Sequence, residues 1–154
     1  MPSHAQVALA VLNQMREAGM PVRSSVIFTR RTDPDSSLGT GSGPAEKVVF
    51  FDARVNRGAV VDHCYWNPEF GGQVEVYPDP AAAARQADSG PDGYRVLVRG
   101  SVLVRLSPHL TRLQVAEYAD VLTHAVGGLS ASGRSRLADH VGVDAARSLL
   151  AVAG

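Results

Sequence analysis

The chain has 154 residues, of which 45% are hydrophobic and 19% are charged. This length suits one domain, and the apolar share is enough to bury a core without metals or disulfides, which excludes disorder throughout. Fifteen Lys and Arg residues balance fifteen Asp and Glu residues. A net charge of zero argues against broad binding to nucleic acids or anionic membranes, which requires a positive field, although a local basic patch stays open.

The sequence contains one cysteine, Cys64. An intramolecular disulfide and an all-cysteine zinc site are therefore excluded. Segment 1–19 lacks the basic start and the unbroken apolar run of a secretory signal. No stretch approaches the roughly 20 apolar residues that a membrane-spanning helix needs. These features predict a cytoplasmic protein that does not bind membranes.

Hydrophobic periodicity predicts the secondary structure. The expected elements in chain order are a helix over 3–19, strands over 22–30, 47–55, 59–65 and 73–77, a helix over 80–87, a β-hairpin over 94–106, a helix over 111–126 and a helical region over 130–154. Ser3, Asp79 and Thr111 are suitable N-caps, because a short polar side chain can accept hydrogen bonds from the first helical turn. Gly19 and the glycine pair 127–128 are expected to end helices.

The predicted elements favour the α+β class. Hairpins and short connections indicate an antiparallel sheet of about five strands with helices packed on one face, plus an N-terminal and a C-terminal helix. We predict one α+β domain over 1–128 and a C-terminal helical appendage over 129–154, which could belong to the same domain. Segments 31–45 and 61–72 are rich in turn-forming residues and are expected to be long polar loops, where function is often located.

Several sequence landmarks follow one another in a fixed order. They are TDPDSSLG over 32–39, KVVFFDAR over 47–54, VEVY over 74–77 and the hairpin RVLVRGSVLVR over 95–105. This order resembles a family of small uncharacterised proteins of Gram-positive bacteria, in which a TDPN-x-LLGRP loop precedes a K-x-x-F-x-D-x-R strand and an IEVF strand. Many members of that family are lipoproteins or secreted. The resemblance covers about 29–122 and implies a compact α+β domain, but no activity.

The two polar loops carry the candidate binding residues. Tyr65 and Trp66, the single tryptophan, form an aromatic pair that suits contact with a ligand or partner, and Glu69 follows them. Asp33 and Asp35 alternate as in a calcium loop, but the further ligands of such a loop are missing, so turn and capping roles are favoured. The first hypothesis is a non-enzymatic binding or protein-interaction domain without a cofactor. Its partner would be an unknown protein or small molecule, and homodimerisation stays open.

Cys64 lies next to His63 and suggests a small cysteine-dependent enzyme as an alternative. Neighbouring residues in a strand point to opposite faces, so His109 or His124 would have to reach the thiol instead. The five histidines show neither i, i+4 pairs nor an H-E-x-x-H motif, and no metal site is predicted. No residue is assigned a catalytic role.

A second alternative is a DNA-binding regulator. Segment 137–150 resembles the core of a helix-turn-helix motif, and Arg134, Arg136 and Arg147 could contact phosphates. Asp144 would repel DNA at the start of the recognition helix. A helical hairpin that packs on the domain or mediates self-association is the competing interpretation.

Charged residues within the strands are expected to form ion pairs. Asp52 and Arg54 are two positions apart in a strand and therefore point to the same side. Glu75 could meet Arg54, Arg95 or Arg105 across strands.

Overall fold

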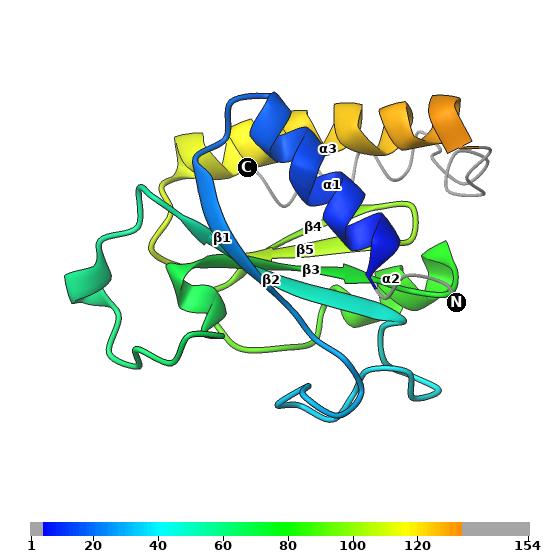
Figure 1. The fold of residues 1–154 in the computed structure, drawn as a ribbon, viewed down its shortest axis with the longest axis horizontal. Helices are drawn as coiled ribbons and strands as arrows, with labels where there is room; N and C mark the ends of the chain where they lie inside the picture. Colours follow the sequence, from blue (N-terminus) through cyan, green and yellow to red (C-terminus); the bar gives the residue numbers. More distant parts are fainter. Residues whose placement is uncertain (1–4, 134–154) are drawn as a thin grey trace.

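The computed structural model describes residues 5–133, which form a five-stranded antiparallel sheet with helices (Figure 1). The elements in chain order are α1 (Gln6–Glu17), β1 (Val22–Ile27), β2 (Glu46–Asp52), the short 3-10 helices η1 (Arg57–Ala59) and η2 (Pro68–Phe70), β3 (Gly71–Val76), α2 (Pro80–Gln86), β4 (Arg95–Arg99), β5 (Val102–Leu106) and α3 (Arg112–Gly133). The strand order is β1-β2-β3-β5-β4, and every neighbouring pair is antiparallel. The predicted α+β fold class is confirmed.

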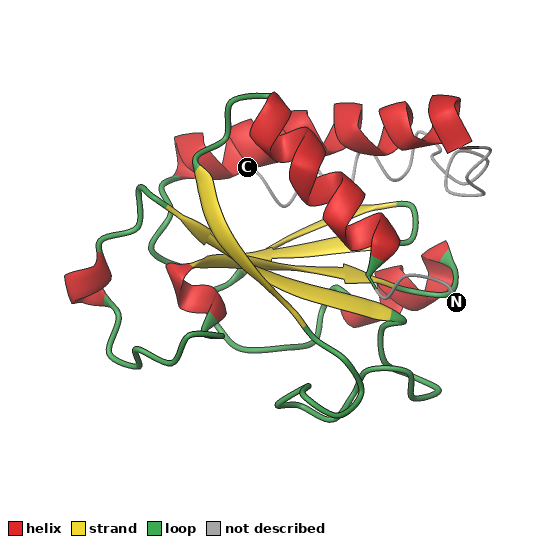
Figure 2. Ribbon diagram, in the orientation of Figure 1, coloured by secondary structure: helices red, strands yellow, loops and turns green. Residues whose placement is uncertain are grey.

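One face of the sheet is apolar and carries the main core. Helices α1 and α3 lie together over this face (Figure 2). The largest fully buried side chains of this core are Val11, Leu12, Met15, Val48, Phe50, Leu97, Leu106, Tyr118 and Leu122. Because burying each such side chain contributes about 1.5–3 kcal/mol, this layer supplies most of the stabilising apolar contact.

The opposite face of the sheet is mixed. Strand alternation places Lys47, Gln73, Glu75 and Arg105 on this face, where they are nearly inaccessible to solvent. The short helix α2 also packs here, through Ala83 in a small cluster with Tyr77 and Leu103, and the long loop after β1 covers the rest. This face therefore holds several charged groups under a cover of loops.

The predicted caps of the second and third helices are confirmed. The Asp79 carboxylate accepts a hydrogen bond from the Ala82 N–H at 2.8 Å. Thr111 and Gln114 form a reciprocal capping box, in which each side chain accepts from the other residue's backbone N–H. The first helix differs, because the side chain that caps it comes from strand β2: the Glu46 carboxylate accepts a hydrogen bond from the Val7 N–H at 2.8 Å. Residue 3, the predicted cap, lies outside the described residues.

The predicted strand over 59–65 is wrong. This part of the chain forms η1 and irregular turns, in which the side chains of Asn56, Asp62 and Asn67 accept from backbone N–H groups two residues further on. Val60 is 2% exposed and packs in the main core, whereas Val61 is 95% exposed, so only one valine of the apolar run that suggested a strand faces the core. Local side-chain hydrogen bonds compete with strand pairing at such positions.

The predicted end of the last helix at 127–128 is also wrong, since α3 continues to Gly133. Glycine inside a helix costs only about 1 kcal/mol relative to alanine, which is too little to end a helix without a proline or a competing cap. The predicted boundary at residue 128 falls within this helix, and the division into domain and appendage stays a prediction.

Arg134, Arg136 and Arg147 lie outside the described residues. Within 5–133, no helix combines the length and the apolar character that a bilayer crossing demands.

Candidate functional site

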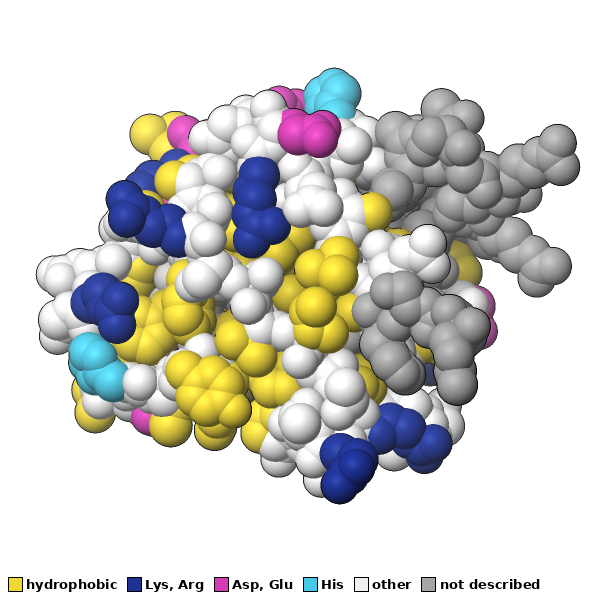
Figure 3. Space-filling model, viewed as in Figure 1, with side chains coloured by type: hydrophobic (Ala, Val, Ile, Leu, Met, Phe, Trp, Pro, Cys, Tyr) yellow, Lys and Arg dark blue, Asp and Glu magenta, His cyan; other side chains and the backbone are white. Residues whose placement is uncertain are grey.

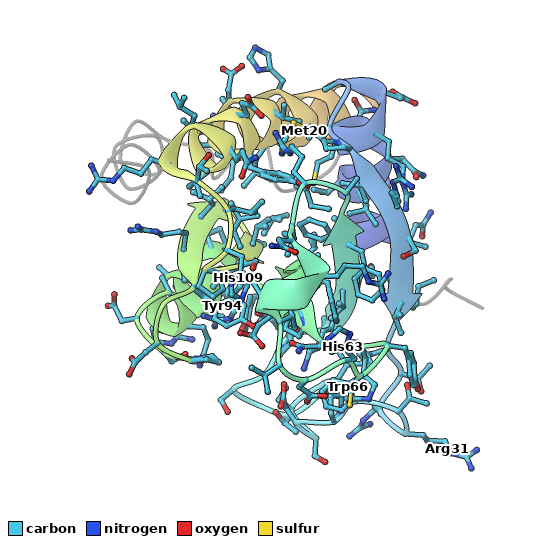
Figure 4. All side chains as sticks on the ribbon, turned by 90° about the vertical axis from the view of Figure 1, so that its left-hand side faces the viewer. Met20, Arg31, His63, Trp66, Tyr94 and His109 are labelled. Carbon is cyan, nitrogen blue, oxygen red and sulfur yellow. The ribbon has the colours of Figure 1, made fainter. Side chains whose placement is uncertain are left out.

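A cavity of about 440 Å³ lies on the mixed face of the sheet. Its floor is formed by polar side chains of the three central strands, namely Lys47, Gln73, Glu75 and Arg105. Its walls come from three separate segments: the loop over 34–44, the turn over 66–68 and the region over 86–94. Figure 4 shows Trp66 among the side chains of the lower loops and Tyr94 on the other side, beside His109. The cavity is thus assembled by segments that are distant in the sequence.

Lys47 anchors the long loop to the floor of the cavity. It is 2% exposed, and its Nζ donates to Asp33 at 2.7 Å and to Asp35 at 2.6 Å. The Asp33 carboxylate is fully buried and also accepts from the backbone N–H groups of Asp35, Ser37 and Leu38. Burial alone would raise the pKa of Asp33, but Lys47 and these N–H groups outweigh it and hold the pKa at about 2.

Glu75 and Arg105 form the second ion pair of the floor. Arg105 Nε donates to Glu75 at 2.7 Å, and Glu75 also accepts from Gln73 at 3.0 Å and from the Tyr77 hydroxyl at 2.6 Å. The remaining guanidinium nitrogens of Arg105 donate to the carbonyl groups of residues 86 and 89. Burial raises the pKa of Tyr77, and the Glu75 charge adds to this effect. The pair therefore ties the region after α2 to the sheet.

The charged side chains on the cavity lining are all engaged in ion pairs, so the cavity does not present an isolated charge. The uncharged part of the lining contains four aromatic residues together with prolines, serines and glycines, and the aromatic residues are Phe28, Trp66, Tyr77 and Tyr94. Burial raises the pKa of Tyr94 to about 12, with a contribution from Glu69, so its hydroxyl stays protonated at neutral pH. Such a surface suits binding by stacking and neutral hydrogen bonds better than acid–base chemistry.

The structure brings together some of the candidate binding residues. Trp66 and Asp35 line the same cavity, whereas Asp33 lies behind it and has the turn-capping role that the sequence favoured. Tyr65 is 70% exposed and does not line this cavity. Glu69 does not line this cavity either, and its carboxylate lies 3.5 Å from His109 Nε2.

Sequence reasoning missed the floor of the cavity. Lys47, Gln73, Glu75 and Arg105 were not selected as binding residues, although they interrupt strands that are otherwise apolar. A charged residue in a buried central strand is costly unless it is paired, and it therefore marks a position that requires partners. Charged residues in apolar strands thus indicate buried positions that need partners, but they do not show which loops pack over them.

Two of the predicted ion pairs are confirmed, although β2 ends at Asp52 and Arg54 lies in the turn that follows it. Arg54 donates to Asp52 through Nε at 3.1 Å and Nη2 at 2.9 Å, and Tyr118 donates to the same carboxylate at 2.6 Å. Of the three arginines considered for Glu75, Arg105 is the partner. These hydrogen bonds to Asp52 join β2 to α3, and the residues that form them do not line the cavity described above.

Cys64 lies in the irregular loop, and its surroundings do not activate it. The Asp62 carboxylate next to the thiol raises the pKa of Cys64, which lowers the thiolate fraction at neutral pH. The His63 ring packs against Phe70 with ring centroids 5.5 Å apart, and His109 faces Glu69. His124 is exposed on α3.

We predict that Cys64 reacts with iodoacetamide at pH 7 more slowly than glutathione does, because its thiolate fraction is reduced. Replacing Asp62 with asparagine removes the nearby negative charge and should increase the rate. Alkylation followed by intact-mass spectrometry measures both rates. A wild-type rate above that of glutathione would contradict the assignment and revive the cysteine-dependent enzyme.

Within the part of the chain that the structure describes, no group of three or more His, Cys, Asp or Glu side chains is arranged to hold a metal ion. Comparisons with protein-family models, curated proteins and solved structures found no match for the chain. The family resemblance stays a prediction.

Proposed function

We propose that this protein is a non-enzymatic binding domain that takes a small molecule into the cavity between the sheet, the loop over 34–44 and the region over 86–94. The observation that carries the proposal is the cavity itself, with a paired polar floor and with Trp66 and Tyr94 in its walls. Its volume of about 440 Å³ falls within the range of small-molecule sites.

Pre-organisation supports the same proposal. The floor side chains are held by hydrogen bonds on β2, β3 and β5, so they do not have to be ordered when a ligand enters. Two of the three wall segments are tied to the sheet, the loop over 34–44 by Lys47 and the region over 86–94 by Arg105. A pre-organised floor with aromatic residues in the walls favours a flat, uncharged or weakly polar ligand, because the floor charges already have partners.

The test compares two neighbouring aromatic residues, of which Trp66 lines the cavity and Tyr65 does not. A fragment library is screened by ligand-observed NMR, and the affinity of each hit is measured for wild type, Trp66→Ala and Tyr65→Ala. We expect Trp66→Ala to weaken binding by about 10-fold or more, as the loss of one stacking side chain predicts, and Tyr65→Ala to change it less than about twofold. Trp66, as the single tryptophan, also reports binding through its fluorescence in wild type.

Two results would contradict the proposal. One is a screen in which no fragment binds to the folded wild-type protein. The other is a set of hits whose affinity is the same for the Trp66→Ala and Tyr65→Ala variants. Thermal unfolding of both variants shows whether they are folded.

A cytoplasmic location is part of this proposal. It is supported by the free thiol of the single cysteine, Cys64, because the cytoplasm keeps thiols reduced. Fractionation of cells that produce the native protein tests it.

A further inference from the structure

A second cavity, of about 310 Å³, lies between β1 and the segment that follows β2. It shares no lining residue with the first cavity. Its apolar surface includes Phe51, Val55 and Phe70, and the two phenyl rings meet edge to face with centroids 5.4 Å apart. The volume lies at the lower end of the range for small-molecule sites.

An irregularity in β1 shapes one side of this cavity. The pairing register with β2 shifts between Val22 and Ser25, so that Arg23 and Ser24 together lie opposite Phe51. A bulge of this kind interrupts the ladder and redirects the side chains that it contains. Arg23 and Ser24 are both exposed and both line the cavity.

Two arginine residues line the cavity, Arg23 from β1 and Arg57 from η1. Arg57, in η1, makes a cation–π contact with Phe70, in which the guanidinium carbon lies 5.3 Å from the ring centroid. Among residues 5–133, neither Arg23 nor Arg57 has a carboxylate within 4.0 Å. Figure 3 shows Lys and Arg side chains around an apolar area on the side where the loop after β2 projects.

The acidic residue on the lining, Asp52, does not cancel this positive charge. Both of its carboxylate oxygens accept hydrogen bonds from Arg54, and Tyr118 donates to one of them. Asp52 is therefore paired with Arg54, which does not line the cavity and which also pairs with Glu117 at 2.6 Å. Two exposed guanidinium groups over an apolar floor remain for a ligand.

We propose that this second cavity binds a carboxylate that is attached to an aromatic ring. The ring would pack on Phe51 and Phe70, and the carboxylate would accept hydrogen bonds from Arg23 and Arg57, which match the two oxygens of a carboxylate. Such a ligand could be a free aromatic acid or the C-terminal residue of a peptide. This site is separate from the cavity of the proposed function.

The experiment compares matched probes at low ionic strength by calorimetry or by NMR of the labelled full chain. Phenylacetate supplies ring and charge, acetate supplies the charge alone, and benzylamine supplies the ring with the opposite charge. We expect phenylacetate to bind at least about 10-fold more tightly than either of the other two, and added salt to weaken its binding.

N-acetyl-phenylalanine and a peptide that ends in phenylalanine represent the peptide source. Tighter binding of the peptide than of phenylacetate assigns the site to a chain terminus, and the reverse assigns it to a free acid.

The variants Arg23→Gln and Arg57→Gln should each weaken phenylacetate binding by about 5-fold or more, whereas Arg31→Gln, at an exposed arginine on the other loop, should not change it. Both cavity arginines are exposed, so the melting temperature should stay near that of wild type. Equal binding of phenylacetate and benzylamine, wild-type affinity in both arginine variants, or no binding of any probe at about 10 mM would overturn the proposal. Trp66→Ala should leave phenylacetate binding unchanged, which separates failure of this site from failure of the first cavity.

Discussion

Replacing Lys47 with methionine is expected to lower the free energy of unfolding by about 3–5 kcal/mol, as measured by urea denaturation. Methionine keeps the length and the apolar stem of the side chain but removes the ammonium group. The Asp33 carboxylate, whose side chain is 0% exposed, would then be buried without a cation. Breaking a buried pair from one side is costly because the remaining charge cannot be solvated.

The second carboxylate that contacts Lys47 provides the matched control. Asp35 is 68% exposed, so water already solvates it and its ion pair contributes little. Asp35→Asn should therefore change the free energy of unfolding by less than about 1 kcal/mol. If Lys47→Met were as mild as Asp35→Asn, the anchoring role of Lys47 would be wrong. Adding Asp33→Asn to Lys47→Met should restore part of the lost stability, because it removes the uncompensated charge.

The Asp33–Lys47 pair also predicts a dependence of stability on pH. The pKa of Asp33 is lowered from 3.8 to about 2 in the folded protein, so the stabilisation from this group is complete above the unfolded-state value and is lost as the pH falls through about 2. A shift of this size corresponds to about 2 kcal/mol. Urea titrations between pH 5 and pH 2 should show this loss in wild type. The loss should be smaller in Lys47→Met, where the ion pair is absent, and equal losses in the two proteins would contradict the assignment.

The fold was largely predictable because its signals are local. Alternation of apolar residues marked the strands, and Asp79-Pro80 and Thr111 marked where two helices begin, since a cap depends on residues three or four positions apart. The strand predicted over 59–65 is wrong because that prediction used the same local signal, the run of apolar residues. Val60 and Val61 look like part of a strand, but only the tertiary structure decides that Val61 faces water.

The candidate site was less predictable because it depends on long-range packing. Trp66 and Asp35 could be selected as loop residues, but nothing local indicates that their loops meet over the same face. The meeting is set by contacts such as Lys47 with Asp33, which are fourteen positions apart, and Arg105 with Glu75, which are thirty apart. Strand order decides these contacts, and β5 inserts between β3 and β4 in a way that the sequence does not reveal.

Replacing Arg105 with leucine is the other change for which we expect a loss of about 3–5 kcal/mol in the free energy of unfolding. Glu75 is 4% exposed and would be left buried with only the neutral donors Gln73 and Tyr77. The carbonyl groups of Gln86 and Ser89 would also lose the guanidinium that holds them. The region after α2 should then detach from the sheet, because this residue links the two.

Arg95→Leu is the control for Arg105→Leu, since Arg95 lies on the adjacent strand β4 but is exposed. A surface change of this kind should alter stability by no more than about 0.5 kcal/mol. Introducing Glu75→Gln together with Arg105→Leu should restore part of the stability, because the amide carries no charge that needs a partner. Hydrogen exchange distinguishes detachment from a uniform loss of stability: faster exchange confined to 86–94 would show that Arg105 fixes the wall of the cavity. Uniformly faster exchange would show that it supports only the sheet.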